Sequence, residues 1–359
     1  MKKKKLLFTA YNLDIGGIET ALINLLNNIN YDKYEVTLIL EKKEGIFLKD
    51  LNKNVILKEI KVSKCKLVVI RKLINFYRKL VFKIFNQNKF DFSCCYATYS
   101  YSSNKLALIG SKNSSIYIHS NYKDVYETEE EIYQFFNTRS ISNFRHIIFV
   151  SNESADYFKK IYKELSGKVK VFNNFINPEK IKELSLEKIN VKKDKEKKLL
   201  VFVGRLDESS KKLTRAVNLV KKINDLNLWI IGDGQDRAMY EEIVKKEKLE
   251  KRILFFGKKK NPYPYMKKAD YIILTSDYEG FPVTYLEALV LNKNIITTIP
   301  VSDDKINIKD YAYIISKDKE SMVKEVEKII GKKKEQKSIS IEEIQKERII
   351  ELEKIFDND

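Results

Sequence analysis

The sequence predicts an α/β protein with two domains, each built on a parallel sheet. Short apolar runs alternate with amphipathic segments along the chain, which is typical of βαβ units. A chain of 359 residues also exceeds the size of one hydrophobic core. A polar, Lys-rich segment at 173–197 divides the alternation into two series. We therefore expect domains at 1–174 and 175–339, with a final helix at 340–359.

The first series begins with an apolar strand at 6–11. The segment 18–29 has apolar residues at three-and-four spacing and is expected to be a helix. Further strands are expected at 34–41, 117–119 and 146–150, each followed by polar residues. Right-handed crossovers between such strands place them in one parallel sheet.

The second series contains the more continuous apolar runs, which indicate strands buried on both faces. These strands are expected at 198–203, 228–231, 253–256, 271–274 and 294–297. The final helix begins with a capping box, Ser340 to Glu343. Its apolar face is expected to comprise Ile341, Ile344, Ile349, Leu352 and Ile355.

The composition is that of a folded globular protein, with 43% hydrophobic and 33% charged residues. The net charge of +18 would attract anionic lipid surfaces, nucleic acid or phosphorylated ligands. Only nine of the 68 basic residues are Arg, and no basic stripe with aromatic platforms is present, so we expect no nucleic-acid partner. Cys65, Cys94 and Cys95 have no metal-ligand spacing and are expected to be reduced, mostly buried thiols.

The N-terminus carries Lys2 to Lys5 before an apolar run that is too short for a signal peptide and lacks a cleavage site. No segment approaches the 18 or so uncharged apolar residues of a membrane span. We therefore expect a cytoplasmic protein that does not cross a bilayer, with peripheral contact at its cytoplasmic face left open.

The segment from Thr275 to Glu287 carries the strongest functional pattern. It follows the strand 271–274, places Glu279 in a short loop, and continues as a helix that contains Glu287. Pro282 suits the first helical position, where an N–H is not needed. Ligands of open α/β sheets bind at the carboxyl ends of strands, where helix N-termini attract anions. Acidic residues in a first helical turn can also serve only to stabilise the helix dipole.

The two glutamates and the Gly280–Pro282 sequence between them resemble the E-x7-E signature of retaining nucleotide-sugar glycosyltransferases of family 4, the glycosyl transferases group 1. Other segments match in the expected order: Gly16–Thr20, Val203–Leu206 with Lys211, Ile230–Gly234, and Phe255–Gly257. The resemblance implies a GT-B fold, in which two Rossmann-like domains face an interdomain cleft and a C-terminal helix crosses back to the first domain. The segment 299–304 departs from the family, which usually has a Gly-rich turn there.

The resemblance also implies roles for individual residues. Arg205 and Lys211 would bind the donor diphosphate and stabilise the charge that develops as the glycosidic bond breaks. Glu279 would contact the sugar or the leaving phosphate, and Glu287 the ribose. His119 ends a strand and opens a loop, where it either touches the transferred sugar or is structural, and His146 is expected to pack or cap.

The implied catalytic residues are Glu279, Arg205, Lys211 and His119. The implied donor-binding residues are Gly16, Gly17, Arg205, Lys211, Glu279, Gly280, Phe281, Pro282, Val283 and Glu287. The implied nucleoside-binding residues are Glu287, Gly257 and Lys258.

The implied reaction transfers a sugar, most often from a UDP-sugar, to an acceptor hydroxyl with retention at the anomeric carbon. No cofactor or metal is expected, because basic side chains neutralise the diphosphate. The acceptor would be a glycan or a polyprenyl-diphosphate-linked glycan of bacterial cell-surface polysaccharide. A catalytically inactive GT-B binding partner of another transferase is the alternative, and an epimerase on the same fold is a more distant one.

The segment 64–89 is basic and has apolar residues at helical spacing. Basic amphipathic helices of this kind can lie on an anionic membrane surface. The same pattern is expected of a helix whose apolar face packs on the first sheet. The sequence leaves these two alternatives open.

Overall fold

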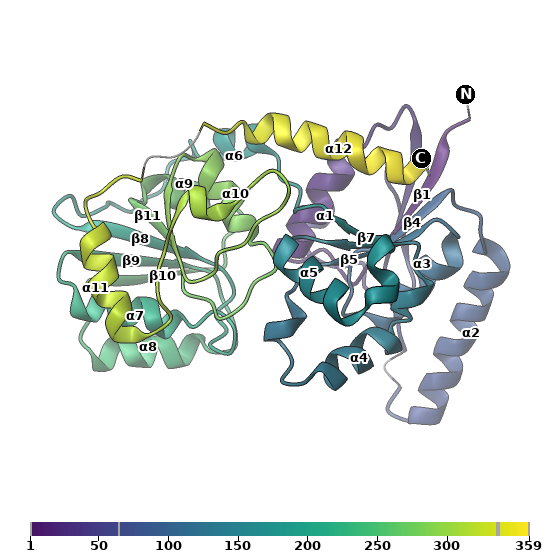
Figure 1. Cartoon of the computed structure of the whole chain (residues 1–359), viewed down its shortest axis with the longest axis horizontal. Helices are drawn as coiled ribbons and strands as arrows, with labels where there is room; N and C mark the ends of the chain where they lie inside the picture. The colour runs from purple at the N-terminus through teal and green to yellow at the C-terminus, as the bar shows by residue number, and fades with distance from the viewer. Residues whose placement is uncertain (1, 64, 335–337, 358–359) are drawn as a thin grey trace. The chain divides into compact units, whose positions relative to one another are not determined.

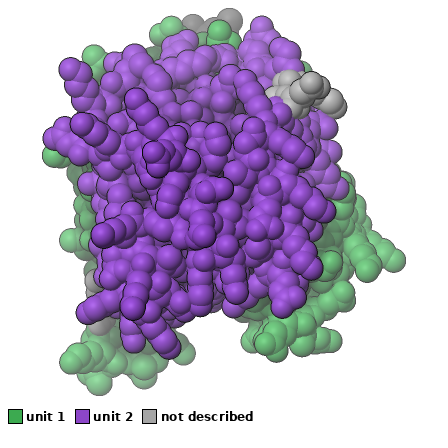
Figure 2. Space-filling view, turned by 90° about the vertical axis from the view of Figure 1, so that its left-hand side faces the viewer, with its two compact units in different colours: residues 1–175, 345–359 green, residues 176–344 purple. Residues whose placement is uncertain are grey.

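A computed structural model describes residues 2–63, 65–334 and 338–357. The chain divides into two compact units (Figures 1 and 2). Unit 1 comprises residues 1–175 and 345–359, and unit 2 comprises residues 176–344. Each contains one parallel sheet covered by helices.

Unit 1 has a seven-stranded parallel sheet with the order β3-β2-β1-β4-β5-β6-β7. Its strands are β1 (Lys4–Ala10), β2 (Tyr34–Leu40), β3 (Ile56–Glu59), β4 (Phe92–Cys95), β5 (Ser114–Ile118), β6 (His146–Phe149) and β7 (Val169–Val171). Its helices are α1 (Gly17–Asn28), α2 (Val68–Asn86), α3 (Tyr101–Gly110), α4 (Glu129–Thr138) and α5 (Asn152–Ile161). The strand order reverses between β1 and β4, which is where a doubly wound sheet opens a ligand crevice.

Unit 2 repeats this design with the strand order β10-β9-β8-β11-β12-β13. Its strands are β8 (Lys198–Val203), β9 (Leu226–Ile231), β10 (Ile253–Gly257), β11 (Tyr271–Leu274), β12 (Asn294–Thr297) and β13 (Ala312–Ile314). Its helices are α6 (Pro178–Leu184), α7 (Leu213–Lys222), α8 (Arg237–Lys246), α9 (Tyr263–Lys268), α10 (Val283–Val290) and α11 (Lys319–Ile329). Here the order reverses between β8 and β11.

The predicted parallel sheets and their principal strands are confirmed. The strands β3, β4, β7 and β13 were not predicted. Three of these lie at sheet edges, where one neighbour and partial exposure leave little apolar signal.

The C-terminal helix α12 (Ile341–Asp357) starts in unit 2 and belongs to unit 1 from Gln345 onward. At its start the Ser340 hydroxyl accepts a hydrogen bond from the Glu343 amide at 3.3 Å. Near its end the Phe356 ring packs on Phe92, with centroids 4.7 Å apart. The buried face differs from the purely apolar one that we expected, because Gln345 and Arg348 are also buried.

All three cysteines are free thiols, with Cys94 and Cys95 buried on β4. Burial raises the pKa of both thiols, to about 12 for Cys95. They therefore stay protonated at neutral pH and contribute to the core rather than to chemistry.

Candidate functional site

The loops after β8 and β11 meet at the point where the strand order of unit 2 reverses. The Asp277 amide donates to the Ser210 carbonyl at 2.8 Å, which ties the second loop to the first. The Thr275 hydroxyl donates to the Lys212 carbonyl at 3.0 Å. These bonds hold Lys211 and Glu279, which the sequence places 68 residues apart, beside each other.

Lys211 and Glu279 form the centre of the candidate site. The Lys211 ammonium lies 2.5 Å from Glu279 Oε1, and both side chains are largely buried, at 20% and 11% exposure. The Ser276 hydroxyl donates to the same carboxylate oxygen at 2.7 Å. The ion pair pre-orients a cation and a carboxylate at the carboxyl end of the sheet. An anionic ligand that binds there could displace the Glu279 carboxylate from the Lys211 ammonium.

Arg205 lies on the same loop but is far more accessible. Its side chain is 70% exposed, and its guanidinium is 3.2 Å from the Asp207 carboxylate. Asp207 in turn accepts from the Ser209 hydroxyl at 2.5 Å and the Ser209 amide at 3.0 Å, which shapes the loop. An exposed guanidinium held at one end by a carboxylate can swing onto a phosphate at little cost.

A second ion pair, between Arg215 and Asp277, holds the loop that carries Glu279. The Arg215 guanidinium of α7 donates to Asp277 Oδ1 at 2.6 Å and to the Thr275 carbonyl at 2.9 Å. Lys212 contributes another cation 3.6 Å from Asp277 and adopts a left-handed backbone, with φ of 48°. Arg215 therefore fixes the loop that carries Glu279, although the sequence did not single it out.

The helix α10 begins at Val283, and Pro282 is its N-cap residue. The prediction of Pro282 as the first helical residue is therefore wrong by one position. Its ψ of 127° is extended, so the chain turns into the helix only after it. Gly280, Phe281 and Pro282 are buried, and the N-terminus of α10 follows the Glu279 loop directly.

Glu287 is buried in α10, at 6% exposure. Its Oε1 accepts a hydrogen bond from the Tyr263 hydroxyl of α9 at 3.0 Å. Burial raises the pKa of Glu287 to about 7, although the Tyr263 hydrogen bond acts in the opposite direction. Burial likewise raises the pKa of Tyr263 well above its ordinary value. The carboxyl group is thus poised between its two protonation states near neutral pH.

In unit 2, two glycines allow backbone arrangements that a Cβ atom would hinder. Gly232 has φ of 151°, and a Cβ there would lie 1.8 Å from the Gly204 carbonyl oxygen. Gly257 ends β10 with φ of 69°, a left-handed conformation that favours glycine. Lys258 follows it and is exposed. Of the three predicted nucleoside-binding residues, Gly257 ends β10, Lys258 follows it, and Glu287 lies in α10.

Gly16 and Gly17 stand at the start of α1, after β1 in unit 1. Gly16 is the extended N-cap residue and Gly17 is the first helical residue. A Cβ on Gly16 would lie 2.2 Å from Glu19 Oε2, so the Glu19 carboxylate folds over this helix start. An anion approaching the Gly16 backbone would have to displace that carboxylate.

His119 follows β5 and packs among aromatic rings. Its imidazole is stacked on Tyr117, with centroids 5.0 Å apart, and lies 4.7 Å from the Tyr96 ring. Its Nδ1 is 3.2 Å from the Asn174 side-chain oxygen. Burial lowers the pKa of His119 to about 4, against the effect of hydrogen bonds with Asn174 and the Tyr96 backbone. The ring is neutral at pH 7 and can act there as a positioned donor or acceptor.

His146, which we expected to pack or cap, has its Nε2 3.1 Å from the Asn113 side-chain oxygen. Asn113 also donates to the Ile355 carbonyl of α12 at 2.8 Å. His146 thus belongs to the packing of α12 on unit 1.

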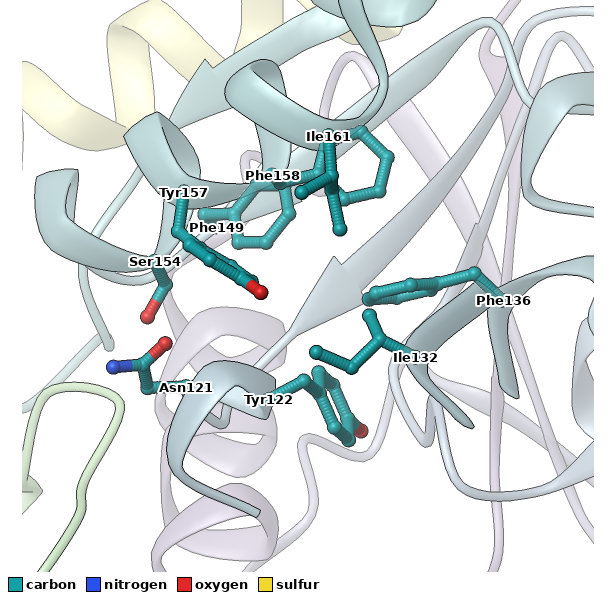
Figure 3. A pocket seen from close by; sticks show the side chains of 9 residues that line it. All are labelled: Asn121, Tyr122, Ile132, Phe136, Phe149, Ser154, Tyr157, Phe158 and Ile161. Carbon is teal, nitrogen blue, oxygen red and sulfur yellow. The ribbon is translucent and has the colours of Figure 1, made fainter. Parts of the chain in front are cut away.

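A small hollow lies in unit 1 between α4, α5 and the η2 turn (Tyr122–Asp124). Figure 3 shows Asn121 and Ser154 pointing toward each other at one end and apolar rings at the other. Its free volume is about 10 Å³, close to the least that holds one water molecule. The hollow is therefore a packing feature, and it is distinct from the loops described above.

Over the described ranges, no three His, Cys, Asp or Glu side chains gather into a metal-binding cluster. Nor is any helix in those ranges long and apolar enough to cross a bilayer.

The segment 299–304 replaces the glycine-rich turn with a turn closed by a side chain. Asp303 Oδ1 accepts hydrogen bonds from the Lys305 and Ile306 amides at 3.0 and 2.6 Å. The Tyr285 hydroxyl of α10 donates to the Ile299 carbonyl at 3.0 Å. The turn is therefore held by hydrogen bonds without glycine and is anchored to the helix that carries Glu287.

Part of this chain is similar to known glycosyltransferases. Residues 185–346 match the glycosyl transferases group 1 family. An uncharacterised glycosyltransferase of Methanocaldococcus jannaschii is 30% identical over 160 residues, which are 42% of this chain and 39% of that protein. The Campylobacter jejuni N-acetylgalactosamine-N,N'-diacetylbacillosaminyl-diphospho-undecaprenol 4-alpha-N-acetylgalactosaminyltransferase is 32% identical over 133 residues, 36% of this chain and 35% of that enzyme. The chain thus matches less than half the length of these curated relatives.

The structure of Anabaena HepE in complex with UDP and glucose is similar over most of both chains. It has a TM-score of 0.68 at 14% identity, over 91% of this chain and 90% of that one. Likeness at this identity concerns the fold alone. The chain has the GT-B fold, and its second unit matches the glycosyl transferases group 1 along nearly its whole length.

Proposed function

We propose that this protein is a retaining glycosyltransferase that moves a sugar from a nucleoside-diphosphate sugar, in the first place a UDP-sugar, to a glycan acceptor. The observation that carries the proposal is the Lys211–Glu279 pair at the point where the strand order of unit 2 reverses. This unit is also the part that matches the glycosyl transferases group 1. HepE, which shares the fold, was solved with UDP and glucose.

In the proposed donor complex, Lys211 exchanges its contact with Glu279 for the donor diphosphate. Arg205 joins it from the loop rim, where its side chain is 70% exposed and exchanges its contact with Asp207 for the diphosphate. Two cations then stabilise the negative charge that grows on the leaving diphosphate as the glycosidic bond breaks. Removal of one such stabiliser typically costs on the order of a hundredfold to a thousandfold in rate.

The carboxylates have separate roles in this proposal. Glu279, released from Lys211, accepts hydrogen bonds from the sugar or contacts the leaving group. Glu287 uses one oxygen for Tyr263, and its other oxygen can accept a ribose hydroxyl. Gly257 and Lys258 are proposed beside the nucleoside, and the 280–283 segment beside the sugar and its phosphate.

Gly16, Gly17 and His119 are proposed to complete the site from unit 1. The glycine backbone would approach the diphosphate, and the neutral His119 ring would hydrogen-bond to the transferred sugar. Attack would occur on the face from which the leaving group departs, and a leaving phosphate oxygen would take the proton of the acceptor hydroxyl. No metal is required in this scheme, because Arg205 and Lys211 supply the positive charge.

The acceptor is proposed to be a glycan or a polyprenyl-diphosphate-linked glycan in the synthesis of bacterial cell-surface polysaccharide. The Campylobacter jejuni relative acts on a diphospho-undecaprenol-linked sugar, which supports this choice. Work on such an acceptor would take place at the cytoplasmic face of the membrane.

The test is thermal stability of the protein against a panel of UDP-, GDP-, ADP- and TDP-sugars. A donor at about a hundred times its dissociation constant should add roughly 2.7 kcal/mol to the free energy of unfolding. Lys211→Met should abolish this stabilisation, and Lys222→Met, which changes an exposed lysine at the far end of α7, should keep it. Absence of stabilisation by every donor would contradict the proposal.

A further inference from the structure

The helix α2 of unit 1 presents an apolar face to solvent. This α2 apolar face consists of Val69, Leu73, Phe76, Tyr77, Leu80 and Ile84, which are 41–71% exposed. At 3.6 residues per turn, these positions share one arc of about 100°. Large exposed apolar surfaces on a folded protein usually mark a binding surface.

The opposite side of α2 is the one that holds it to unit 1. Phe82 is buried at 6% exposure in a cluster with Leu7 and Leu106. Asn75 accepts a hydrogen bond from the Ser63 amide at 2.7 Å. In Figure 1, α2 lies along the outer edge of unit 1. The alternative in which its apolar face packs on the sheet is therefore wrong.

Basic side chains border the α2 apolar face on one side, where Lys72 and Lys83 lie along its edge and are exposed. Arg71 and Arg78 lie on the opposite side of the helix, beside Phe82, and the Arg78 guanidinium donates to the Lys61 carbonyl. The sequence from residue 60 to residue 90 contains nine Lys or Arg residues and no Asp or Glu. Long basic side chains at such borders can reach toward an anionic surface while their stems lie along apolar groups.

We propose that α2 docks this protein on an anionic lipid bilayer, with the α2 apolar face inserted among the acyl chains and the flanking cations on the lipid phosphates. A bilayer with anionic headgroups matches both properties, since it offers an apolar interior beneath a negative surface. A second copy of the chain does not match, because a two-fold contact would place two such basic segments against each other. The inference stands on α2 alone and goes beyond the proposed sugar transfer.

The test is co-sedimentation of the protein with vesicles of phosphatidylcholine, with and without phosphatidylglycerol. Binding should require phosphatidylglycerol and weaken with salt. Lys72→Gln with Lys83→Gln should weaken binding about 25-fold, at about fivefold for each cation. Leu73→Glu with Ile84→Glu should weaken it at least about tenfold, because two inserted side chains are lost.

Two matched variants in unit 2 serve as controls. Leu186→Glu changes a leucine that is 68% exposed, and Lys222→Gln removes an exposed cation. Both should bind vesicles as the unchanged protein does. Circular dichroism melting should be unaltered in all variants, because every substituted side chain is exposed.

Equal binding to vesicles with and without phosphatidylglycerol, or equal binding by the α2 variants, would overturn the proposal. A dimer in solution that Leu73→Glu with Ile84→Glu dissociates, without vesicle binding, would instead assign the face to a second copy and would also overturn it. Donor-induced stabilisation is measured without lipid, so failure of docking leaves the test of sugar transfer unaffected.

Discussion

The substitution Glu287→Gln tests whether burial governs the titration of this carboxyl group. The pKa of Glu287 rises from 4.5 to about 7 on folding because the group is buried. A carboxyl whose folded pKa is raised favours the folded state below its unfolded pKa, and this advantage is lost as pH rises through about 7. At about 1.4 kcal/mol for each tenfold change in the ionisation equilibrium, ionised Glu287 lowers the free energy of unfolding by roughly 3 kcal/mol at pH 8.5.

Glutamine has nearly the same shape, carries no charge, and can still accept the Tyr263 hydrogen bond. Glu287→Gln should therefore stabilise the protein by up to about 3 kcal/mol at pH 8.5 and by less than about 1 kcal/mol at pH 5. Urea unfolding followed by fluorescence measures this directly, because the single tryptophan, Trp229, is buried in β9 of unit 2. The exposed Glu242→Gln on α8 is the matched control and should show no pH-dependent gain. An equal effect of Glu287→Gln at both pH values would refute the reasoning.

Three further outcomes are expected. Tyr263→Phe removes a hydrogen bond that lowers the pKa of Glu287. The midpoint of the pH-dependent stability should therefore move upward, and about 1 kcal/mol of stability should be lost. An unmoved midpoint in urea titrations across pH would contradict this. The chain has only two histidines, and burial lowers the pKa of both His119 and His146 to about 4, so both imidazole C–H resonances should titrate well below pH 6 in NMR spectra; a midpoint near 6.5 for either ring would contradict its burial. Excess EDTA should leave donor-induced stabilisation unchanged, because protein cations are proposed to neutralise the diphosphate, and loss of the stabilisation that Mg²⁺ restores would overturn metal independence.

The central strands were predictable because long apolar runs report burial on both faces. Strand β8, for example, was predicted with its observed bounds, 198–203. The edge strand β3 (Ile56–Glu59) was missed because its residues are largely exposed and two of the four are charged. Exposure removes the apolar pattern from which a strand is predicted.

The candidate site was predictable only in part. The sequence placed Lys211 and Glu279 after two strands, but their contact depends on β8 and β11 being neighbours, which is a property of the strand order. The Tyr263–Glu287 contact likewise depends on how α9 packs on α10. Arg215 could have been suspected as one of few arginines, although nothing local indicates its contact with Asp277.

The orientation of α2 could not be predicted from the sequence either. Its apolar positions have the spacing of a core-facing helix. Only the structure shows that these positions face solvent and that Phe82, on the opposite side of the helix, is buried. A hydrophobic pattern indicates that a helix is amphipathic but not what covers its apolar face.

The central claim is that unit 2 binds a nucleoside-diphosphate sugar and that the protein transfers its sugar with retention. The most direct measurement follows the turnover of a stabilising donor by proton NMR and records the anomer that forms first, with an acceptor or with water. The account predicts release of the nucleoside diphosphate and a first-formed sugar anomer of the same configuration as in the donor, with turnover by Lys211→Met lower by a hundredfold or more. An inverted anomer would contradict retention. Donor binding without any turnover would contradict catalysis and favour a binding partner of another transferase.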